Sequence, residues 1–349
     1  MIEIEQQIWG MTAEGEPVIL YTMTNASGAW VKLTNLGATV VGVGAPDKDG
    51  AIADVVLGYK EWQSYQGDGA AMGKSVGRYA NRIARGKFTL DGEDYRLAIN
   101  NGPNALHGGP TGFQNRLWAS RVEGNRVVFN YVSAPGEEGY PSELGAEACY
   151  DWDDDCNLEI TYHASTDGAT IVNLTNHLYF NLKGEGNGII EDHQLQLACE
   201  KWLPTDQTQI PTGEFADVEG TPMDFRQSTV IGSRIEDDFE ALKIGKGYDH
   251  CWAIDGWEKG KLCYAGELYE PKSGRAVEVR TTQAGIQIYT GNWLDGSPMG
   301  KTNEYLDRSG VAMECQAFPD SPNKENFPSV VLCKGEVYEQ HIIYSFKVK

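Results

Sequence analysis

The stretch Asn173–Leu182, which reads NLTNHLYFNL, decides how the fold of this chain is interpreted, because its side chains alternate between two kinds. The apolar members of one parity are Leu174, Leu178, Phe180 and Leu182, and the polar members of the other are Asn173, Thr175, His177, Tyr179 and Asn181. In an extended strand, successive side chains point to opposite faces, so one face packs on a core and the other faces a ligand. A surface of amides, hydroxyls and one imidazole favours a polyhydroxylated ligand such as a sugar.

Similar short runs recur along the chain and predict strands at 38–45, 53–59, 125–133, 158–165, 193–200, 261–270, 275–282, 285–291, 329–335 and 341–348. Turn-forming residues separate these runs, with 41 Gly in all, and the helical candidates are two short segments, 60–67 and 233–243. Regularly spaced short strands favour a large β-sandwich or barrel over alternating β/α units. No linker divides the chain, so we expect one domain over residues 1–349.

The charge of the chain excludes several classes of partner. The 50 acidic residues outnumber the 29 basic ones, which gives a formal net charge of -21. Such a chain repels nucleic acid and anionic membranes, so a neutral small molecule is the better ligand. No apolar run reaches the roughly 20 residues that a membrane helix needs, and the first residues resemble no signal peptide. We therefore predict a cytoplasmic protein with reduced cysteines, monomeric or homodimeric.

Three motifs resemble ligand sites but depart from them at decisive positions. Residues 68–75 resemble a phosphate-binding loop, yet Asp68 replaces its first glycine. Residues 151–162 resemble a calcium loop, yet Cys156 replaces its turn glycine and Tyr162 its bidentate glutamate, so a turn between strands is expected. The histidines and cysteines lack the spacings typical of zinc sites, although distant ligands could still converge. We predict no metal and no cofactor.

Two further segments combine a polar with an apolar face. In the segment 310–323, Glu314 and Gln316 oppose an apolar parity, and in the segment 285–291 Gln287 alternates with isoleucines. A glutamate in such a strand is most often exposed to solvent. The flanking Met313 and Cys315, and the PDSPN turn that follows, favour a functional carboxylate.

Four other residues have a structural and a functional interpretation. Asn81 and Arg82 lie in a basic island of this acidic chain, which is either a surface arginine cluster or a binding site. His107 precedes a Gly-Gly-Pro turn and either caps it or belongs to a site. Asp249, next to His250 at the start of an apolar run, is either a turn residue or a ligand-binding one.

Six ordered motifs together resemble the aldose 1-epimerase (galactose mutarotase) family. They are SVGRYANRIARGKF, NALHGG, VNLTNHLYFNLKGEG, GYDHCW, GIQIYTGNWLDG and MECQAFPDSPN, and the resemblance extends from about Gly37 to Phe346. It implies a single-domain, mostly antiparallel β-supersandwich that binds a free sugar such as galactose or glucose. It also implies Glu314 as general base and His177 as general acid. The residues that the resemblance assigns to sugar binding are Asn81, Arg82, His107, Asp249 and Gln287.

Interconversion of anomers requires a proton to leave the C1 hydroxyl and another to reach the ring oxygen, which general acid–base catalysis can supply. We expect Asp249 or Glu314 to raise the pKa of His177, and Arg82 to keep Glu314 ionised. The pH profile of the rate should then be bell-shaped. Three alternatives remain open. One is a phosphorylated hexose as substrate, against which the acidic charge of the chain and the lack of a second basic cluster argue only weakly. A glycoside hydrolase would need a second carboxylate, for which Asp249 is the candidate, and a non-catalytic protein would only bind sugar.

Overall fold

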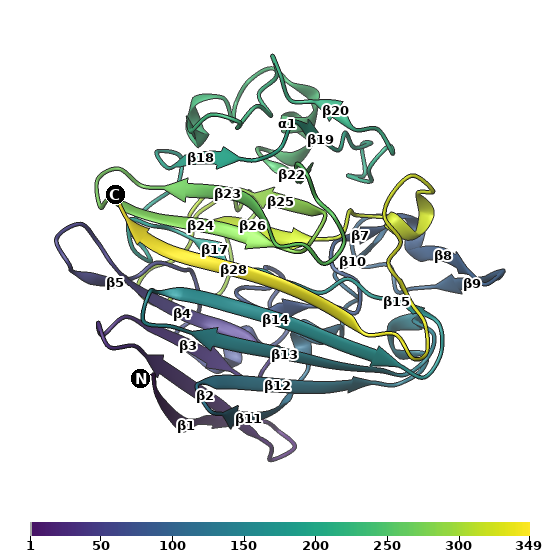
Figure 1. The fold of residues 1–349 in the computed structure, drawn as a ribbon, viewed down its shortest axis with the longest axis horizontal. Helices are drawn as coiled ribbons and strands as arrows, with labels where there is room; N and C mark the ends of the chain where they lie inside the picture. The colour runs from purple at the N-terminus through teal and green to yellow at the C-terminus, as the bar shows by residue number, and fades with distance from the viewer. Residues whose placement is uncertain (1) are drawn as a thin grey trace.

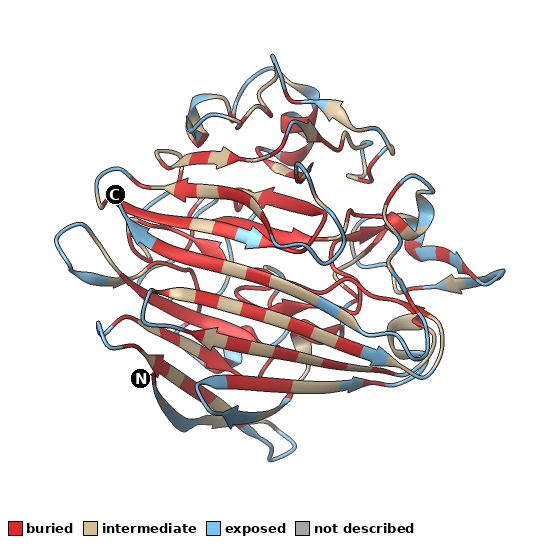
Figure 2. Ribbon diagram, in the orientation of Figure 1, coloured by how far each residue is buried: buried red, intermediate tan, exposed pale blue. Residues whose placement is uncertain are grey.

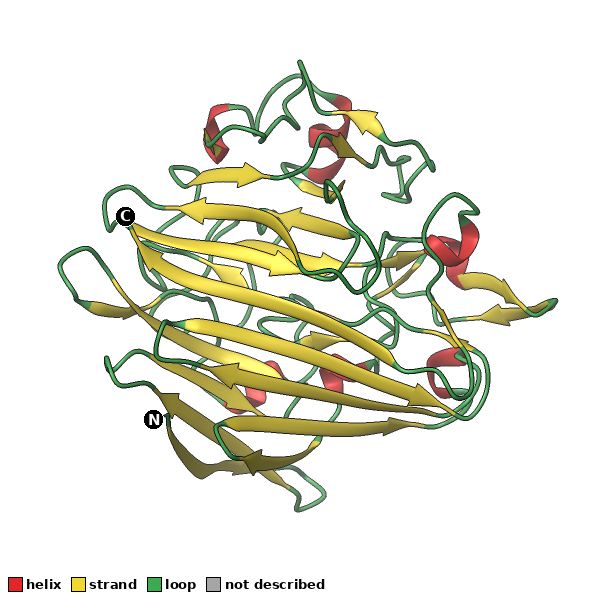
Figure 3. Ribbon diagram, viewed as in Figure 1, coloured by secondary structure: helices red, strands yellow, loops and turns green. Residues whose placement is uncertain are grey.

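The computed structural model describes residues 2–349, and its strands form three large antiparallel sheets (Figure 1). Four two-stranded ladders complete the sheet structure. They are β10 (Ala105–Leu106) with β7 (Arg82–Ile83), β15 (Thr170–Ile171) with β27 (Val331–Leu332), β16 (Thr175–Asn176) with β6 (Ser75–Val76), and β8 (Lys87–Leu90) with β9 (Glu93–Arg96). Figure 3 shows how little of this part of the chain is helical.

The largest sheet has nine strands. In spatial order they are β11 (Ala119–Glu123), β12 (Arg126–Ser133), β13 (Leu144–Trp152), β14 (Asn157–Thr166), β28 (Tyr338–Val348), β24 (Arg275–Thr281), β23 (Cys263–Tyr269), β18 (Gln194–Leu197) and β21 (Thr229–Val230). Burial alternates residue by residue along β13 and β14, as Figure 2 shows. One face of this sheet therefore packs on the core and the other faces outward.

Two smaller sheets complete the sandwich. The five-stranded sheet runs β1 (Glu3–Met11), β2 (Pro17–Thr24), β3 (Trp30–Thr34), β4 (Thr39–Pro46) and β5 (Ile52–Asp54). The six-stranded sheet runs β17 (Tyr179–Phe180), β26 (Val311–Gln316), β25 (Gly285–Tyr289), β22 (Asp249–Ala253), β19 (Lys201–Trp202) and β20 (Ala216–Asp217). One apolar cluster takes Val31 from β3, Ile160 from β14 and Ile286 from β25, so the three sheets share a core.

The structure confirms the predicted all-β, mostly antiparallel supersandwich. The segment 233–243 is helical only at its end, in α1 (Glu240–Gly245), and the segment 60–67 holds a single 3-10 turn, η1 (Trp62–Tyr65). The other 3-10 turns are η2 (Ala84–Gly86), η3 (Phe113–Asn115), η4 (Glu137–Gly139), η5 (Ile231–Ser233) and η6 (Ser321–Asn323). Within residues 2–349, no helix has the length and apolar character needed to cross a membrane.

The opening stretch does not form the continuous strand that its alternation predicted. Only Thr175–Asn176 and Tyr179–Phe180 have strand conformation, because they pair with two different partners, β6 and β26. Every residue from 173 to 182 is buried, whatever its parity. The segment is therefore an irregular connection threaded through the interior, and its polar side chains need partners inside the protein.

Candidate active site

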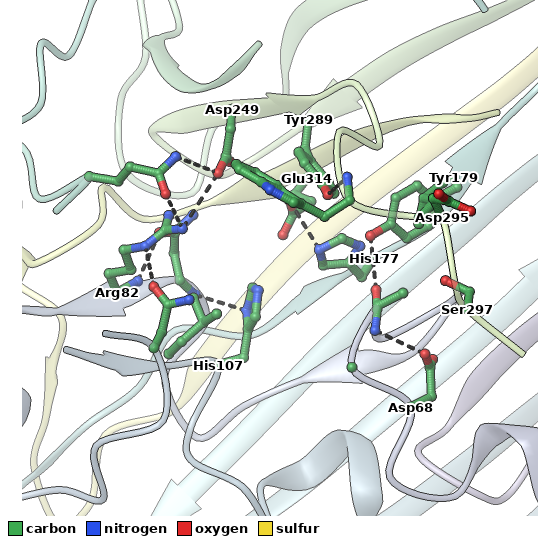
Figure 4. Close-up of a pocket in the computed structure, with 18 of the residues that line it drawn as sticks. Asp68, Arg82, His107, His177, Tyr179, Asp249, Tyr289, Asp295, Ser297 and Glu314 are labelled. Atoms are coloured by element: carbon green, nitrogen blue, oxygen red, sulfur yellow. Dashed lines mark hydrogen bonds and ion pairs between the residues drawn. The ribbon is translucent and has the colours of Figure 1, made fainter. Parts of the chain in front are cut away.

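A cavity of about 620 Å³ lies over one face of the six-stranded sheet. Figure 4 shows Arg82 and Asp249 at one end, His177 and Glu314 at the centre, and Asp68, Asp295 and Ser297 at the other end. The volume lies within the range of about 300–1,000 Å³ that is typical of small-molecule sites. The cavity contains six of the seven predicted site residues on its wall: Asn81, Arg82, His107, His177, Asp249 and Glu314.

The sheet register positions the acidic residues of the site. Glu314 on β26 pairs with Gln287 on β25, and Asp249 on β22 pairs with Tyr289 on β25. Since alternate residues of a strand share a face, all four side chains lie on the same side of the sheet. Gln287 is the seventh predicted residue and is not among those that line the cavity. Its Nε2 donates to Asp249 Oδ1 at 2.7 Å, so Gln287 holds Asp249 from behind.

His177 reaches Glu314 from the neighbouring segment. Its backbone N–H donates to the Lys74 carbonyl and its own carbonyl accepts from Gly73, which fixes the main chain on both sides. Its Nε2 lies 3.4 Å from Glu314 Oε1, and both side chains are almost completely buried. The Tyr179 ring tilts against the imidazole, with the two centroids 4.9 Å apart. A potential proton donor and acceptor thus share one edge of the cavity.

The polar parity of the opening stretch divides into two roles. Only His177 and Tyr179 line the cavity. Thr175 donates to the Cys315 carbonyl, and Asn181 donates to the carbonyls of Gly188 and Ser309. Asn173 donates to the Ala80 carbonyl and accepts from the Ala317 N–H. The expectation of one ligand-facing surface was therefore wrong for three of the five polar residues, which instead satisfy buried main-chain groups.

Asn81 and His107 form a part of the cavity wall that does not belong to the six-stranded sheet. Both have positive φ, 66° and 52°, and Gly108 next to His107 also has a positive φ of 75°. A Cβ on Gly108 would lie 2.0 Å from the Gly77 carbonyl oxygen, so only glycine fits there. The Asn81 N–H donates to His107 Nδ1 at 3.2 Å. An accepting Nδ1 leaves the proton of the neutral ring on Nε2, so His107 offers a hydrogen-bond donor.

Arg82 and Asp249 form a buried charged pair at one end of the cavity, with Arg82 Nη2 3.5 Å from Asp249 Oδ2. The guanidinium also donates from Nε to Asn101 at 3.0 Å and from Nη2 to Gln209 at 2.7 Å. Gln209 in turn donates to Asp249 at 2.8 Å. Burial opposes ionisation of Asp249, but Arg82 and the neighbouring donors outweigh it and lower the pKa of this carboxyl.

Burial dominates the proton affinities at the centre of the site. It lowers the pKa of His177 to about 4, although Asp68 and Asp249 act in the opposite direction. Burial, assisted by Asp249, raises the pKa of Glu314 well above its usual range, and Arg82 offsets only part of that effect. The expectations of a raised His177 pKa and of a Glu314 kept ionised by Arg82 were therefore wrong, because desolvation exceeds the effect of the neighbouring charges.

Potential metal ligands do converge here: one donor atom each from His107, His177 and Glu314 lies within 4.8 Å of the others. Two histidines and a glutamate form a known zinc-binding combination. His107 fits it poorly, because Nδ1 already accepts from Asn81 and Nε2 then carries the proton. Coordination by His107 would break that hydrogen bond. The prediction that the site works without a metal stays a prediction.

The alternation placed Tyr179 on the polar face with His177, and Tyr289 shares the polar parity of Gln287; both tyrosines line the cavity. The sequence interpretation missed three other residues of the cavity wall, Trp293, Asn101 and Gln209. Trp293 stacks on Tyr289 at an interplanar angle of 21° and is 44% exposed, which makes an aromatic platform at the cavity. Asn101 and Gln209 come from turns without any recognisable motif.

The rejected loop motifs have structural roles. Asp68 lines the cavity and accepts hydrogen bonds from the Tyr59 hydroxyl and from the N–H groups of Ala70 and Met72. Lys74, which would hold phosphate in a nucleotide-binding loop, is buried against the Tyr65 carbonyl and Asn115. The acidic residues after Asp151 form a turn between β13 and β14, as predicted.

Comparison with known proteins gives matches over nearly the whole chain. The profile of the family described as aldose 1-epimerase matches residues 20–345. The galactose mutarotase of Bos taurus is 40% identical over 349 residues, which is all of both chains. The aldose 1-epimerase of Escherichia coli (strain K12) is 38% identical and covers 96% of this chain and 97% of its own.

Solved structures of related proteins have the same fold. The galactose 1-epimerase of Lactobacillus acidophilus NCFM superposes with a TM-score of 0.86 at 26% identity, covering 100% of this chain and 99% of its own. The aldose epimerase homologue of C. elegans gives a TM-score of 0.85 at 29% identity, with the same coverage.

Proposed function

We propose that this chain, which belongs to the aldose 1-epimerase family, opens and closes the ring of a free aldose between His177 and Glu314. The chain is an isomerase that interconverts the α and β anomers of an aldose such as galactose. The observation that carries the assignment of the site is the 3.4 Å contact between Nε2 of His177 and Oε1 of Glu314 inside the cavity.

In the proposed reaction, Glu314 accepts the proton of the C1 hydroxyl while His177 donates a proton to the ring oxygen. The bond between C1 and the ring oxygen breaks and a free aldehyde forms. Rotation about the C1–C2 bond exposes the other face of the aldehyde, and the two proton transfers reverse as the ring closes. Each positioned acid or base typically contributes about two to four orders of magnitude in rate.

The pKa shifts favour one arrangement of a single shared proton over another. The pKa of His177, near 4, favours a neutral imidazole, and burial, which raises the pKa of Glu314, favours a protonated carboxyl. The reactive form, imidazolium with carboxylate, contains the same single proton. A sugar hydroxyl that donates to Glu314 and a ring oxygen that accepts from His177 both favour the charged form, so substrate binding itself prepares the pair.

The other wall residues are suited to holding sugar hydroxyls. His107 offers an Nε2 donor because Nδ1 is occupied, Arg82 offers N–H groups, and the ionised Asp249 offers acceptor sites. The exposed Trp293, stacked on Tyr289, offers an apolar face for a pyranose ring. We propose that Asn81 and Gln287 act indirectly, through His107 and Asp249 respectively.

The test is polarimetry of freshly dissolved α-galactose with the wild type and with Glu314→Gln, which keeps the size of the side chain and removes the base. We expect the variant to lose about 100-fold or more in kcat. The matched control is Glu336→Gln, which makes the same change at an exposed turn and should keep the wild-type rate. A substitution of Gln316 would not serve as a control, because that side chain is buried beside the site. A Glu314→Gln enzyme with the full rate contradicts the assignment.

Neither the glycoside hydrolase nor the non-catalytic alternative is favoured, since the full-length relatives are mutarotases and aldose epimerases. In the same experiment an aryl glycoside serves as the hydrolysis control, and release of its sugar would support the glycoside hydrolase alternative.

We also propose that the chain forms one domain, which the core shared by the three sheets supports. We propose a cytoplasmic location, which the seven free thiols support, and a monomer or homodimer as the oligomeric state.

A further inference from the structure

Gln209 bridges the two charged residues at one end of the cavity. Its Oε1 accepts from Arg82 Nη2 at 2.7 Å, and its Nε2 donates to Asp249 Oδ2 at 2.8 Å. The direct contact between Arg82 Nη2 and Asp249 Oδ2 is 3.5 Å, longer than the roughly 2.7–2.9 Å of a strong charge-assisted hydrogen bond. The neutral amide of Gln209 therefore bonds to both the Arg82 guanidinium and the Asp249 carboxylate, and those two charged groups stay 3.5 Å apart.

The loop that carries Gln209 is braced so that the amide has one orientation. The Asp206 carboxylate accepts from the N–H groups of Thr208 and Ile210, at 2.7 and 3.1 Å. Asn104, close in sequence to His107, donates to the Thr208 carbonyl at 3.1 Å. Gln209 itself has a φ of 62°, a left-handed conformation that is uncommon for a residue with a Cβ. The surrounding contacts hold it there, as is typical of functional positions.

This arrangement leaves one nitrogen of the Arg82 guanidinium, Nη1, available to a ligand. Within residues 2–349, the hydrogen bonds and ion pairs found for its guanidinium use Nε and Nη2 and leave Nη1 without a partner. Because Nε already donates to Asn101, a direct two-pronged pair between Arg82 and Asp249 would be end-on and would use Nη1 as well as Nη2. By occupying Nη2 and Oδ2, Gln209 keeps Nη1 for a sugar hydroxyl.

We propose that Gln209 is a positioning residue that sets the spacing of Arg82 and Asp249 for binding of sugar hydroxyls. The inference rests on the proposed function, because it assumes that the sugar lies in this cavity. Gln209 takes no part in proton transfer. Its loss therefore weakens the binding of the ground state and of the transition state to the same extent, which raises KM and spares kcat.

The experiment replaces Gln209 with Met, which has a similar length and no amide, and Gln207 with Met as the matched control. Gln207 lies on the same loop, is exposed, and bonds to Glu240 rather than to the site. Initial rates of mutarotation are measured by polarimetry over a range of α-galactose concentrations. For Gln209→Met we expect KM to rise roughly 10-fold with kcat within about threefold of wild type, and for Gln207→Met no change in either.

A second variant keeps the test decisive if Met disturbs the loop. Gln209→Glu retains an acceptor for Arg82 but places a carboxylate against Asp249, so it should also raise KM. A wild-type KM in both variants overturns the inference, and so does a fall in kcat with KM unchanged. If the wild type does not accelerate mutarotation at all, the proposed function has failed instead.

Discussion

At the residue scale, the site depends on where one proton lies. Desolvation raises the pKa of Glu314 and lowers that of His177, so it favours the proton on Glu314, against the expectation from the neighbouring charges. Asp249 stays ionised because Arg82, Gln287 and Gln209 compensate its burial. The pKa values of Asp249 and Glu314 are thus shifted in opposite directions, which is how proteins assign different roles to similar groups.

The pH dependence of kcat/KM follows from these shifts. Below about pH 4, His177 is protonated while Glu314 keeps its proton, so the pair holds two protons and the rate falls. Above the raised pKa of Glu314, the pair loses its single proton and the rate falls again. We expect the plot of kcat/KM against pH to be bell-shaped with a broad maximum, once the spontaneous rate of mutarotation is subtracted at each pH. A rate that only rises with pH would show that the carboxylate acts without the imidazolium.

At the scale of elements, adjacent strands provide Glu314 and Asp249, and irregular connections provide the histidines and the arginine of the site. Glu314 and Asp249 are fixed by the register of β26, β25 and β22. His177, His107 and Arg82 lie in or beside short ladders and turns, which side-chain hydrogen bonds to the backbone hold in place. Such bracing residues are as necessary to the geometry as the groups that touch the sugar.

Asn173 gives the clearest test of this bracing. Its side chain donates to the Ala80 carbonyl and accepts from the Ala317 N–H, tying the segment before Asn81 to the chain after β26. Asn173→Ala leaves one buried and one partly buried backbone group unpaired, so we expect the free energy of unfolding to fall by roughly 2–4 kcal/mol in chemical denaturation. Asn187→Ala, which removes an exposed amide bonded to the Lys183 carbonyl, should cost less than about 0.5 kcal/mol. Equal losses in the two variants would contradict the bracing role.

At the scale of the whole molecule, the fold brings together residues that are far apart in the sequence, from Arg82 to Glu314. The all-β class could be predicted because alternation is a local property, as β14 illustrates. β13 was missed although its burial alternates without a break, because two of its buried residues are Ala146 and Ala148, and small side chains give a weak signal.

Residues in recognisable motifs could be nominated for the candidate site from the sequence, and residues whose place depends on tertiary contacts could not. Six of the seven predicted residues line one cavity, and Gln287 lies directly behind it. Gln209 could not be found from its own turn, because its role depends on Arg82, 127 positions away in the chain. The protonation of His177 was also out of reach, because burial outweighs the charges that the sequence displays.

The most direct test of the central claim, that Glu314 and His177 act as one proton-transferring pair, is a double-mutant cycle on the mutarotation of α-galactose. Glu314→Gln, His177→Gln and the double variant are compared by kcat/KM at the pH optimum of the wild type. Residues that act as a unit are strongly non-additive, so each single variant should lose about as much as the double one. Losses that multiply in the double variant would show two independent contributions and contradict the pair.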